Sequence, residues 1–322
     1  MIFILNEARE GNVPPVLEWL VHAEVPFTVL NSDMPFEEID LEIGKAGTKG
    51  ALVFGSKRIE LDEVQACWYR RGDMLLADEV DEQSMNFVDT HYNPEWSCLT
   101  RFLTKKLMQV PTIADPALSD LDKLTMLDAA QQAGLTVSKS YVVSSKKRLL
   151  DLLDQHPNMI TKGIADSIDL ADGDTYWGAS TEVIDREKVQ LMPERFFPSL
   201  VQPYVEKQVE LRVFYLCEKM WAMAIFSQND PQTCLDYRNY NFDRPNRNVP
   251  FALPQDIQDK VISMMDLLGM NTGSLDFILT PNNEFVFLEV NPDGQYGWLS
   301  ENCNYYLEKA IADNLIYAHE KD

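Results

Sequence analysis

The stretch TGSLDFILTPNNEFVFLEVNP, residues 272–292, predicts a β-hairpin, because two apolar runs flank the turn-forming sequence Pro-Asn-Asn. Each run nevertheless carries acidic or amide side chains: Asp276 in the first run, and Glu289 and Asn291 in the second. A buried carboxylate is costly unless it is paired with a charge, hydrogen-bonded or bound to a cation. The rest of the sequence must therefore supply partners for these groups.

The spacing predicts how these side chains meet. Asp276 and Glu289 are nearly equidistant from the turn at Asn282 and Asn283, so we expect them to pair across the hairpin. Strand residues i and i+2 share a face about 6.6 Å apart, so Asn291 joins Glu289. Three hard oxygen donors on one face suit Mg²⁺, which also binds water and nucleotide phosphates. Spacing alone leaves an alternative equally open, in which two separate acids are hydrogen-bonded to the backbone.

Length and composition indicate a multidomain globular protein. The 322 residues exceed one ordinary core, and 45% hydrophobic with 25% charged residues is typical of soluble proteins. No run of about 18 apolar residues predicts a membrane helix, and the N-terminus lacks the features of a signal peptide. The five cysteines are scattered and form no C-x-x-C, which argues against disulfides and structural zinc. We therefore expect a cytoplasmic protein that does not bind membranes.

The net charge of −23 restricts the partners of the protein. Nucleic acids and anionic membranes are bound through basic patches, so a strongly acidic chain disfavours both. Any site for an anion must be locally basic against this overall charge. Lysines and arginines inside polar motifs are therefore candidate site residues.

The hydrophobic pattern predicts an α/β (α+β) protein. The chain begins as βαβ, with strands at 1–5 and 26–31 around a helix at 12–24. A hairpin at 50–61, a strand at 64–72 and a helix over 80–108 follow, and 110–116 is an extended link at a first domain boundary. The later elements alternate helices and strands: a helix at 118–137, a strand at 139–144, a helix at 145–155, a strand at 158–164, strands within 199–228, a helix at 254–270, and polar loops at 165–180 and 236–250.

Two isolated lysines extend the argument to phosphates. Lys123 lies in a helix, and Lys162 ends the apolar run NMITK before a glycine-containing loop. Such lysines are often only solvated charges, but lysine is also a common phosphate binder and loop amides can close over phosphates. The sequence contains no Walker P-loop, and no G-x-G-x-x-G follows a first strand. A nucleotide site of a different type is the remaining possibility.

The order of these motifs resembles the ATP-grasp superfamily over roughly residues 115–300. The two lysines and the glycine-bearing loop are followed by the hinge strand LVQPYVEK, by arginines in VELR and DYRNY, and by LDF…FLEVNP. More narrowly, CWYRRG, ELRVF, LDYRNY and LEVNPDGQYGWLS resemble the microviridin-type, or graspetide, synthetases, including the grasp-with-spasm branch. These enzymes macrocyclise ribosomal peptides. The WYRR and GQYGW motifs extend the resemblance to nearly the whole chain.

The resemblance implies an ATP-grasp fold of three domains. These are an N-terminal α/β domain (1–115), a central domain (116–195) and a C-terminal domain with the metal site (196–322), with ATP between the last two. The implied ATP-binding residues comprise two phosphate-binding lysines and three adenine-facing hinge residues: Lys123, Lys162, Gln202, Tyr204 and Val205. The implied catalytic and metal-binding groups comprise two arginines that steady the γ-phosphate and acyl phosphate, and ligands for two Mg²⁺ ions: Arg212, Arg238, Asp276, Glu289 and Asn291.

One departure from the pattern concerns the loop 163–180, which holds four aspartates and no lysine or arginine. Such a composition is unusual for a segment that covers ATP. Arg70 and Arg71 have a simpler interpretation than substrate binding, as a pair that stabilises the N-terminal domain through salt bridges. We favour that interpretation.

The implied activity is that of a leader-dependent peptide ligase. It would phosphorylate Asp or Glu side chains of a ribosomal precursor peptide, made of a leader and an acidic, Thr-rich core. It would then form ω-esters with Thr or Ser, or less readily ω-amides with Lys, releasing ADP and phosphate. A homodimer is a family expectation. The alternatives are an ATP-grasp ligase that joins an amino acid to a metabolite or a protein C-terminus, and a non-catalytic nucleotide-binding regulator.

Overall fold

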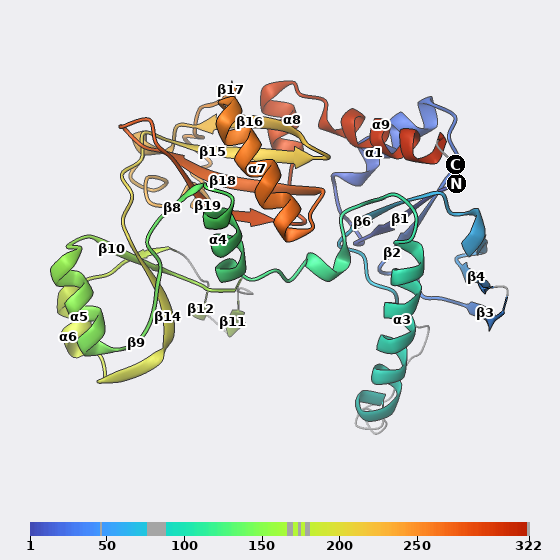
Figure 1. Cartoon of the computed structure of the whole chain (residues 1–322), viewed down its shortest axis with the longest axis horizontal. Helices are drawn as coiled ribbons and strands as arrows, with labels where there is room; N and C mark the ends of the chain where they lie inside the picture. Colours follow the sequence, from blue (N-terminus) through green and yellow to red (C-terminus); the bar gives the residue numbers. More distant parts are fainter. Residues whose placement is uncertain (46, 76–87, 166–169, 173–174, 178–180, 321–322) are drawn as a thin grey trace. The chain divides into compact units, whose positions relative to one another are not determined.

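The computed structural model describes residues 1–45, 47–75, 88–165, 170–172, 175–177 and 181–320. The chain forms two compact units (Figure 1). The first contains residues 1–119 and 295–322, and the second contains residues 120–294. The three-domain boundaries at 115 and 195 remain predictions.

The first unit is built on a parallel sheet of order β2-β1-β6-β7. Its strands and the crossover helix are β1 (Ile2–Asn6), α1 (Val13–His22), β2 (Phe27–Asn31), β6 (Ala66–Arg70) and β7 (Thr112–Ile113). The predicted βαβ beginning is confirmed. Helix α1 begins with prolines in its first turn, where their missing N–H groups have no intrahelical partner to lose.

Helices cover this sheet, whose central strands β1 and β6 are buried throughout and mostly apolar, as expected for parallel strands buried on both faces. Helix α3 (Asn93–Leu107) packs Leu103 and Leu107 into the same core cluster as Phe3, Leu5 and Cys67. Helix α1 packs beside α9 (Leu307–Glu320), which follows the short α8 (Gly297–Cys303) and contacts β1 and β6. The predicted helix over 80–108 is described from residue 88 onward, first as a π-helix (Val88–Tyr92) and then as α3; residues 80–87 lie outside the described part.

A separate three-stranded antiparallel sheet contains β3 (Glu38–Gly44), β4 (Gly47–Phe54) and β5 (Lys57–Glu60). The hairpin expected at 50–61 is confirmed as β4–β5. Strand β3 was not expected, because it lies at the sheet edge and most of its side chains are exposed, so it carries little apolar signal.

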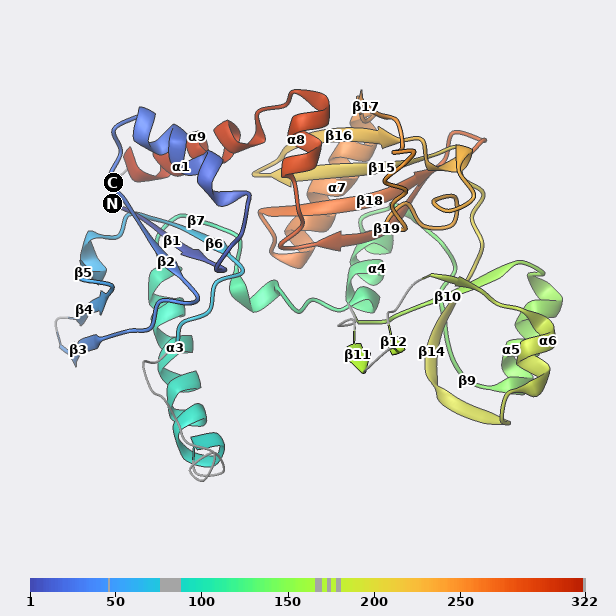
Figure 2. The same ribbon diagram turned by 180° about the vertical axis from the view of Figure 1, so that it is seen from behind.

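The second unit contains a six-stranded sheet of order β17-β16-β15-β18-β19-β8. Its strands are β8 (Thr136–Val137), β15 (Val209–Leu216), β16 (Lys219–Ile225), β17 (Asn248–Phe251), β18 (Thr272–Leu279) and β19 (Phe285–Asn291). Helices α4 (Lys123–Gln132) and α7 (Gln255–Leu268) lie side by side on one face of this sheet (Figures 1 and 2). The opposite face is thereby left for the charged residues.

Helix α4 is shorter than the predicted 118–137. Its first free amides are captured by the Asp122 carboxylate, which accepts from the N–H groups of Leu124 and Thr125, so the helix begins at Lys123. It ends before Gly134, whose positive φ of 79° lets the chain turn into β8. These two signals place Lys123 in the first turn of the helix.

A smaller antiparallel sheet in the same unit has the order β13-β10-β14-β9. Its strands and helices are β9 (Tyr141–Ser145), α5 (Lys146–Gln155), β10 (Met159–Lys162), β13 (Glu182–Val183), α6 (Arg186–Leu191) and β14 (Arg195–Pro203). The helices share a core cluster with one face of the sheet, through residues such as Leu152, Met159 and Val201.

The segment 165–180 was expected to be a loop throughout, but part of it forms strands. Strands β11 (Leu170–Asp172) and β12 (Thr175–Trp177) pair antiparallel, and periodicity is a weak signal for strands of three residues. Asp166, Asp169 and Asp174 lie outside the described residues.

Among the described helices, none combines the length and apolarity needed to cross a bilayer.

The turn after β19 yields a stability prediction. A Cβ added at Gly294 would lie 2.3 Å from Cβ of Ser274, so Gly294→Ala should lower the free energy of unfolding by about 1–3 kcal/mol through overpacking. The double variant Gly294→Ala/Ser274→Gly removes the opposing atoms. Its free energy of unfolding should therefore fall by less than the sum of the decreases in the two single variants. Urea unfolding of all four proteins measures this. Additive losses would contradict the steric explanation.

Candidate functional site

The charged residues of the site form one row across three strands. The hairpin has the predicted register, with Asp276 opposite Glu289. On the other side of β18, Asp276 is opposite Arg212 of β15. Neighbouring strands lie about 4.8 Å apart, so the backbones set these three side chains next to one another on one face.

A β-bulge modifies this hairpin. The pairing moves from Asp276 opposite Glu289 to Phe277 opposite Phe287, so Leu288 is an extra residue in β19. Phe277 and Phe287 pack together on the helix-covered face, with ring centroids 5.5 Å apart. Leu288 and Glu289 both line the pocket on the opposite face, although they are consecutive.

Asp276 is paired with a buried arginine. Nη1 of Arg212 donates to Oδ2 of Asp276 at 2.8 Å, and the Tyr237 hydroxyl donates to Oδ1 at 3.3 Å. Arg212 and Asp276 are both about 7% exposed or less. Burial raises the pKa of the Asp276 carboxyl and Arg212 opposes that shift, while the nearby Glu289 adds to it.

Glu289 is surrounded by cations. Nζ of Lys123 lies 3.0 Å from Oε2, and Nη1 of Arg238 lies 3.5 Å from Oε1. Burial opposes ionisation of Glu289, but the charges of Lys123, Lys162 and Arg238 outweigh it and lower the pKa of the carboxyl. Both buried acids therefore have basic side-chain partners in this structure.

Arg238 is aimed by a neighbouring aspartate. Nε and Nη2 of Arg238 donate to the Asp236 carboxylate at 2.9 and 2.7 Å, and the backbone N–H of Arg238 also donates to it at 3.0 Å. Asp236 is buried, whereas the Arg238 side chain is 53% exposed. The arginine is thus fixed at its base and remains accessible.

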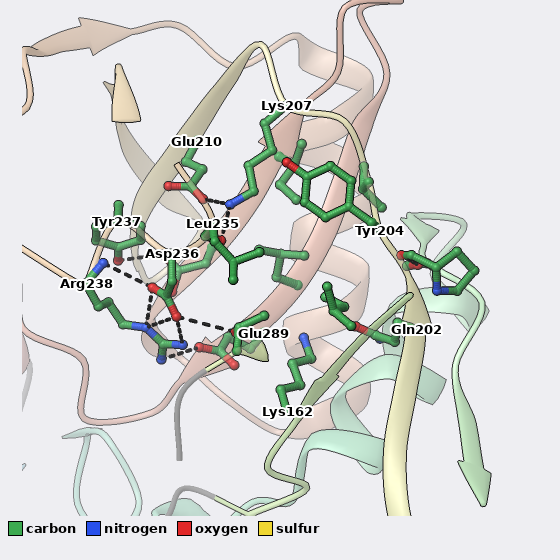
Figure 3. Close-up of a pocket in the computed structure, with 18 residues that line it drawn as sticks. Lys162, Gln202, Tyr204, Lys207, Glu210, Leu235, Asp236, Tyr237, Arg238 and Glu289 are labelled. Carbon is green, nitrogen blue, oxygen red and sulfur yellow. Dashed lines mark hydrogen bonds and ion pairs between the residues drawn. The ribbon is translucent and has the colours of Figure 1, made fainter. Parts of the chain in front are cut away.

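Asp236, Arg238, Asp276 and Glu289 border a pocket within the second unit (Figure 3). Ile160 and Lys162 share one face of β10, and Gln202 of β14 lies opposite Ile160. The pocket is therefore lined by that face of the small sheet, by the chain that follows β14, and by the charged face of the large sheet. Its lining combines apolar and ionisable side chains, an arrangement common in small-molecule sites.

The structure brings most of the predicted site residues together. Seven of them line this pocket: Lys162, Gln202, Tyr204, Val205, Arg238, Asp276 and Glu289. Lys123 and Asn291 line a smaller adjoining pocket, which shares Glu289 with the larger one. Arg212 lies behind them as the buried partner of Asp276. Their roles toward ATP and Mg²⁺ remain predictions.

The donor chemistry is compatible with the predicted magnesium site. Asp276 and Glu289 supply carboxylate oxygens and Asn291 an amide oxygen, which are the ligand types that Mg²⁺ prefers. Within the described residues, no group of three or more His, Cys, Asp or Glu is placed to hold a metal. The proposed set therefore depends on Asn291 as its third member.

Sequence reasoning missed a further buried ion pair in this pocket. Lys207 pairs with Glu210 and donates to the carbonyl of Leu235 at 2.6 Å, and Ser227 donates to Glu210 at 3.0 Å. Alternation along β15 places Glu210 on the same face as Arg212 and could have revealed it. The spacing of Asp236 and Arg238, two residues apart in sequence, could likewise have indicated that these two side chains pair.

Arg70 and Arg71 have the structural role that was favoured. Arg70 Nη2 lies 3.3 Å from Oε2 of Glu10, and Arg71 Nη1 lies 4.0 Å from the same oxygen. Glu10 and Arg70 are buried, and the Arg70 guanidinium stacks over the Tyr296 ring. The WYRR and GQYGW motifs therefore meet within the first unit.

Comparisons with known proteins identify the fold. No protein-family model matches the chain, and no curated protein matches it in sequence. A RiPP-associated ATP-grasp ligase from Chryseobacterium gregarium, solved with ADP and a leader and core peptide, is similar with a TM-score of 0.84 and 19% identity, over 98% of this chain and 96% of that one.

Two further solved structures agree with this match. Macrocyclase MdnC bound to precursor peptide MdnA, from Microcystis aeruginosa MRC, has a TM-score of 0.79 and 22% identity over 98% of this chain and 99% of that one. The ATP-grasp ligase PsnB, complexed with minimal precursor, Mg and ADP, has a TM-score of 0.73 and 15% identity over 99% and 97%. The chain has an ATP-grasp fold, as predicted.

Lys162 gives a prediction about charge in the pocket. Burial lowers the pKa of its amine to about 8, against the attraction of Glu289 and with a contribution from Lys123. Glu289→Gln removes that attraction and should lower the pKa of Lys162 further. NMR titration of the ¹³C-methylated lysines, assigned with Lys162→Arg, measures both values. A Lys162 pKa near 10 would contradict the burial described here.

The Arg212–Asp276 pair gives a second prediction. Arg212→Met should lower the free energy of unfolding by about 3–5 kcal/mol, because the Asp276 carboxylate stays buried without its charge partner. Arg212→Met/Asp276→Leu removes both charges and should recover much of the loss. Urea unfolding tests both variants. A loss below about 1 kcal/mol for the single variant would show that the pair is dispensable.

Proposed function

We propose that this protein is an ATP-dependent ligase that macrocyclises a ribosomal precursor peptide. The observation that carries the proposal is the accessible, aimed Arg238 beside Lys162 and the buried acids, in a fold shared along nearly its whole length with RiPP-associated ligases. The neighbouring structures hold ADP, Mg and precursor or leader and core peptides. Those ligands fit the charges and the apolar lining found in this pocket.

The proposed roles follow the positions of the side chains. Lys123 and Lys162 bind ATP phosphates, because both are cations close to Glu289. Gln202, Tyr204 and Val205 hold adenine against the apolar wall formed by residues such as Ile278. The base and the phosphates would thus occupy different parts of one pocket.

The chemistry consists of two displacements. A peptide Asp or Glu carboxylate attacks the γ-phosphorus of ATP, the bond to the bridging oxygen breaks, and ADP leaves. The hydroxyl of a Thr or Ser then attacks the acyl carbon of the acyl phosphate and loses its proton as phosphate leaves, forming an ω-ester; a Lys amine would give an ω-amide. Activation is required because a carboxylate oxygen is a poor leaving group.

The side chains of this protein would neutralise charge in both steps. Phosphoryl transfer depends mainly on positioning and on cations around the phosphate oxygens. Arg238 is held by Asp236 with its side chain half-exposed, so it can bind the transferred phosphoryl group bidentately. Arg212 supports the same region by holding Asp276, in addition to any contact with the acyl phosphate.

Magnesium fits the oxygen donors of this site. Asp276, Glu289 and Asn291 would hold the two predicted ions, which would neutralise negative charge on the phosphates. In this structure Lys123 and Arg212 pair with carboxylate oxygens of Glu289 and Asp276 that would also bind the metal. Metal binding would therefore require these oxygens to contact both the ion and the basic side chain, or the ion pairs to open.

The partner is an acidic, Thr-rich core attached to a leader. A carboxylate-rich peptide is repelled by a protein of charge −23, so it needs a locally basic site such as the one around Arg238. Leader dependence, a cytoplasmic location and a homodimer complete the proposal, as does the absence of nucleic-acid and membrane binding. All five cysteines are free, consistent with a reducing compartment.

Intact mass measurement tests this function. The enzyme is incubated with ATP, Mg²⁺ and the short peptide encoded beside its gene, and we expect the peptide to lose one or more waters, about 18 Da each, as rings form. Mild base then opens esters and leaves amides. Arg238→Ala should abolish the loss, and its thermal unfolding is recorded because the buried Asp236 loses its charge partner.

Two outcomes would overturn the proposal. An unchanged peptide mass with ADP formation on free amino acids would indicate a small-substrate ligase. Nucleotide binding without turnover of any carboxylate would indicate a regulator. A Glu289→Ala enzyme provides a second inactive control, with thermal unfolding recorded to establish that it is folded.

A further inference from the structure

Two aromatic side chains are exposed on the loop that follows Arg238. Tyr240 is 46% exposed and Phe242 is 87% exposed. Their rings contact each other edge to face, with centroids 5.0 Å apart. We call residues 239–247 the aromatic loop. Exposed aromatic rings of this kind are enriched where proteins bind partners, because each offers a large apolar area with few rotatable bonds.

Hydrogen bonds hold the aromatic loop in place. Asn241 donates to the Asp230 carboxylate at 2.6 Å, and its own oxygen accepts from the N–H groups of Asp243 and Arg244 at 3.1 Å. Gln232 donates to the carbonyl of Tyr240 at 3.0 Å. The exposure of the two rings is therefore a feature of an anchored loop, and a partner would lose little entropy in ordering it.

The aromatic loop begins next to the catalytic pocket. The N–H of Tyr240 donates to the carbonyl of Arg238 at 2.8 Å. Phe242 is four residues from Arg238, and four extended residues span at most about 14 Å. A peptide whose side-chain carboxylate reaches Arg238 can therefore contact both rings within about four of its own residues.

The charge of this segment favours an acidic partner. Residues 236–247 contain three arginines and two aspartates, one of which is the partner of Arg238, a net charge of 3 − 2 = +1, in a chain whose net charge is −23. Arg244 is exposed, while Arg247 lies against the Phe226 ring at 5.4 Å. Distant charges are screened beyond about 8 Å at physiological salt, so an approaching peptide responds mainly to this local positive charge.

We propose that Tyr240 and Phe242 dock the acidic core of the precursor peptide beside the carboxylate that is being activated. The proposal rests on the proposed ligase function and adds a specificity element outside the nucleotide pocket. The rings pack against apolar and methyl-bearing side chains of the core, and Arg244 attracts its carboxylates. Neither ring is among the residues that line the pocket.

Steady-state kinetics test this docking surface. Tyr240→Ala/Phe242→Ala should raise KM for the precursor at least about tenfold, since losing about 1.4 kcal/mol of binding corresponds to that factor. KM for ATP and the affinity for the leader peptide alone should not change. Tyr240→Phe/Phe242→Tyr keeps both rings and should stay within about twofold of the wild type.

Matched controls separate docking from general damage. Tyr317→Ala removes an aromatic side chain that is 60% exposed on α9 and should not affect KM for the precursor. Removing exposed rings leaves no cavity, so thermal unfolding should be unaltered, and Phe242→Ala alone serves if the double variant is unstable. Arg244→Gln should raise KM at low salt and weaken the dependence of KM on salt.

Three results would overturn the docking proposal: an unchanged KM for the precursor in the double alanine variant, an equal rise in Tyr317→Ala, or a rise in KM for ATP instead. The last would assign the rings to the nucleotide. If the wild-type enzyme cyclises no peptide, the ligase function fails on its own. If the wild-type enzyme cyclises the peptide and the double alanine variant does so with the same kcat/KM, only the docking proposal is wrong.

Discussion

Burial of two carboxylates, Asp276 and Glu289, is the constraint on which the second unit depends. Each lies on the inner part of a strand, and each is paired with basic side chains from other elements: Arg212 on β15 for the first, and Lys123 on α4 for the second. A buried pair gains little net free energy, because desolvation offsets attraction, but removing one member is expensive. We infer that these pairs contribute more to how α4, β15, β18 and β19 come together than to the net stability of the fold.

The same pairs organise the electrostatics of the pocket. The protein is strongly acidic overall, yet Lys162 and Arg238 lie within reach of Glu289 and open onto the pocket. Asp236 holds Arg238, so a carboxylate orients a cation that faces an anion. Asp236 thus positions Arg238, and a locally basic pocket is built within a chain of net charge −23.

Sequence reasoning could predict the local part of this arrangement. Counting from the turn at Asn282 and Asn283 predicts Asp276 opposite Glu289, and the structure has that pairing because the bulge at Leu288 adds one residue to β19. The pairing of Arg212 with Asp276 joins residues 64 apart in sequence and depends on β15 lying next to β18, which no local pattern specifies. The family resemblance supplied the order of the motifs and the fold. It did not supply the buried partners Glu210, Asp236 and Tyr237, which become visible only once the strands are adjacent.

The bulge at Leu288 has a consequence for how such chains are compared. Before it, Phe285 and Phe287 face the helices; after it, Val290 does, so the strand changes from odd to even alternation within a few residues. An alignment guided by apolar periodicity alone would shift Glu289 by one position and assign its place to a core residue. At identities of 15–22%, the carboxylates of chains that share this fold are therefore better matched by their cross-strand partners than by their neighbours in sequence.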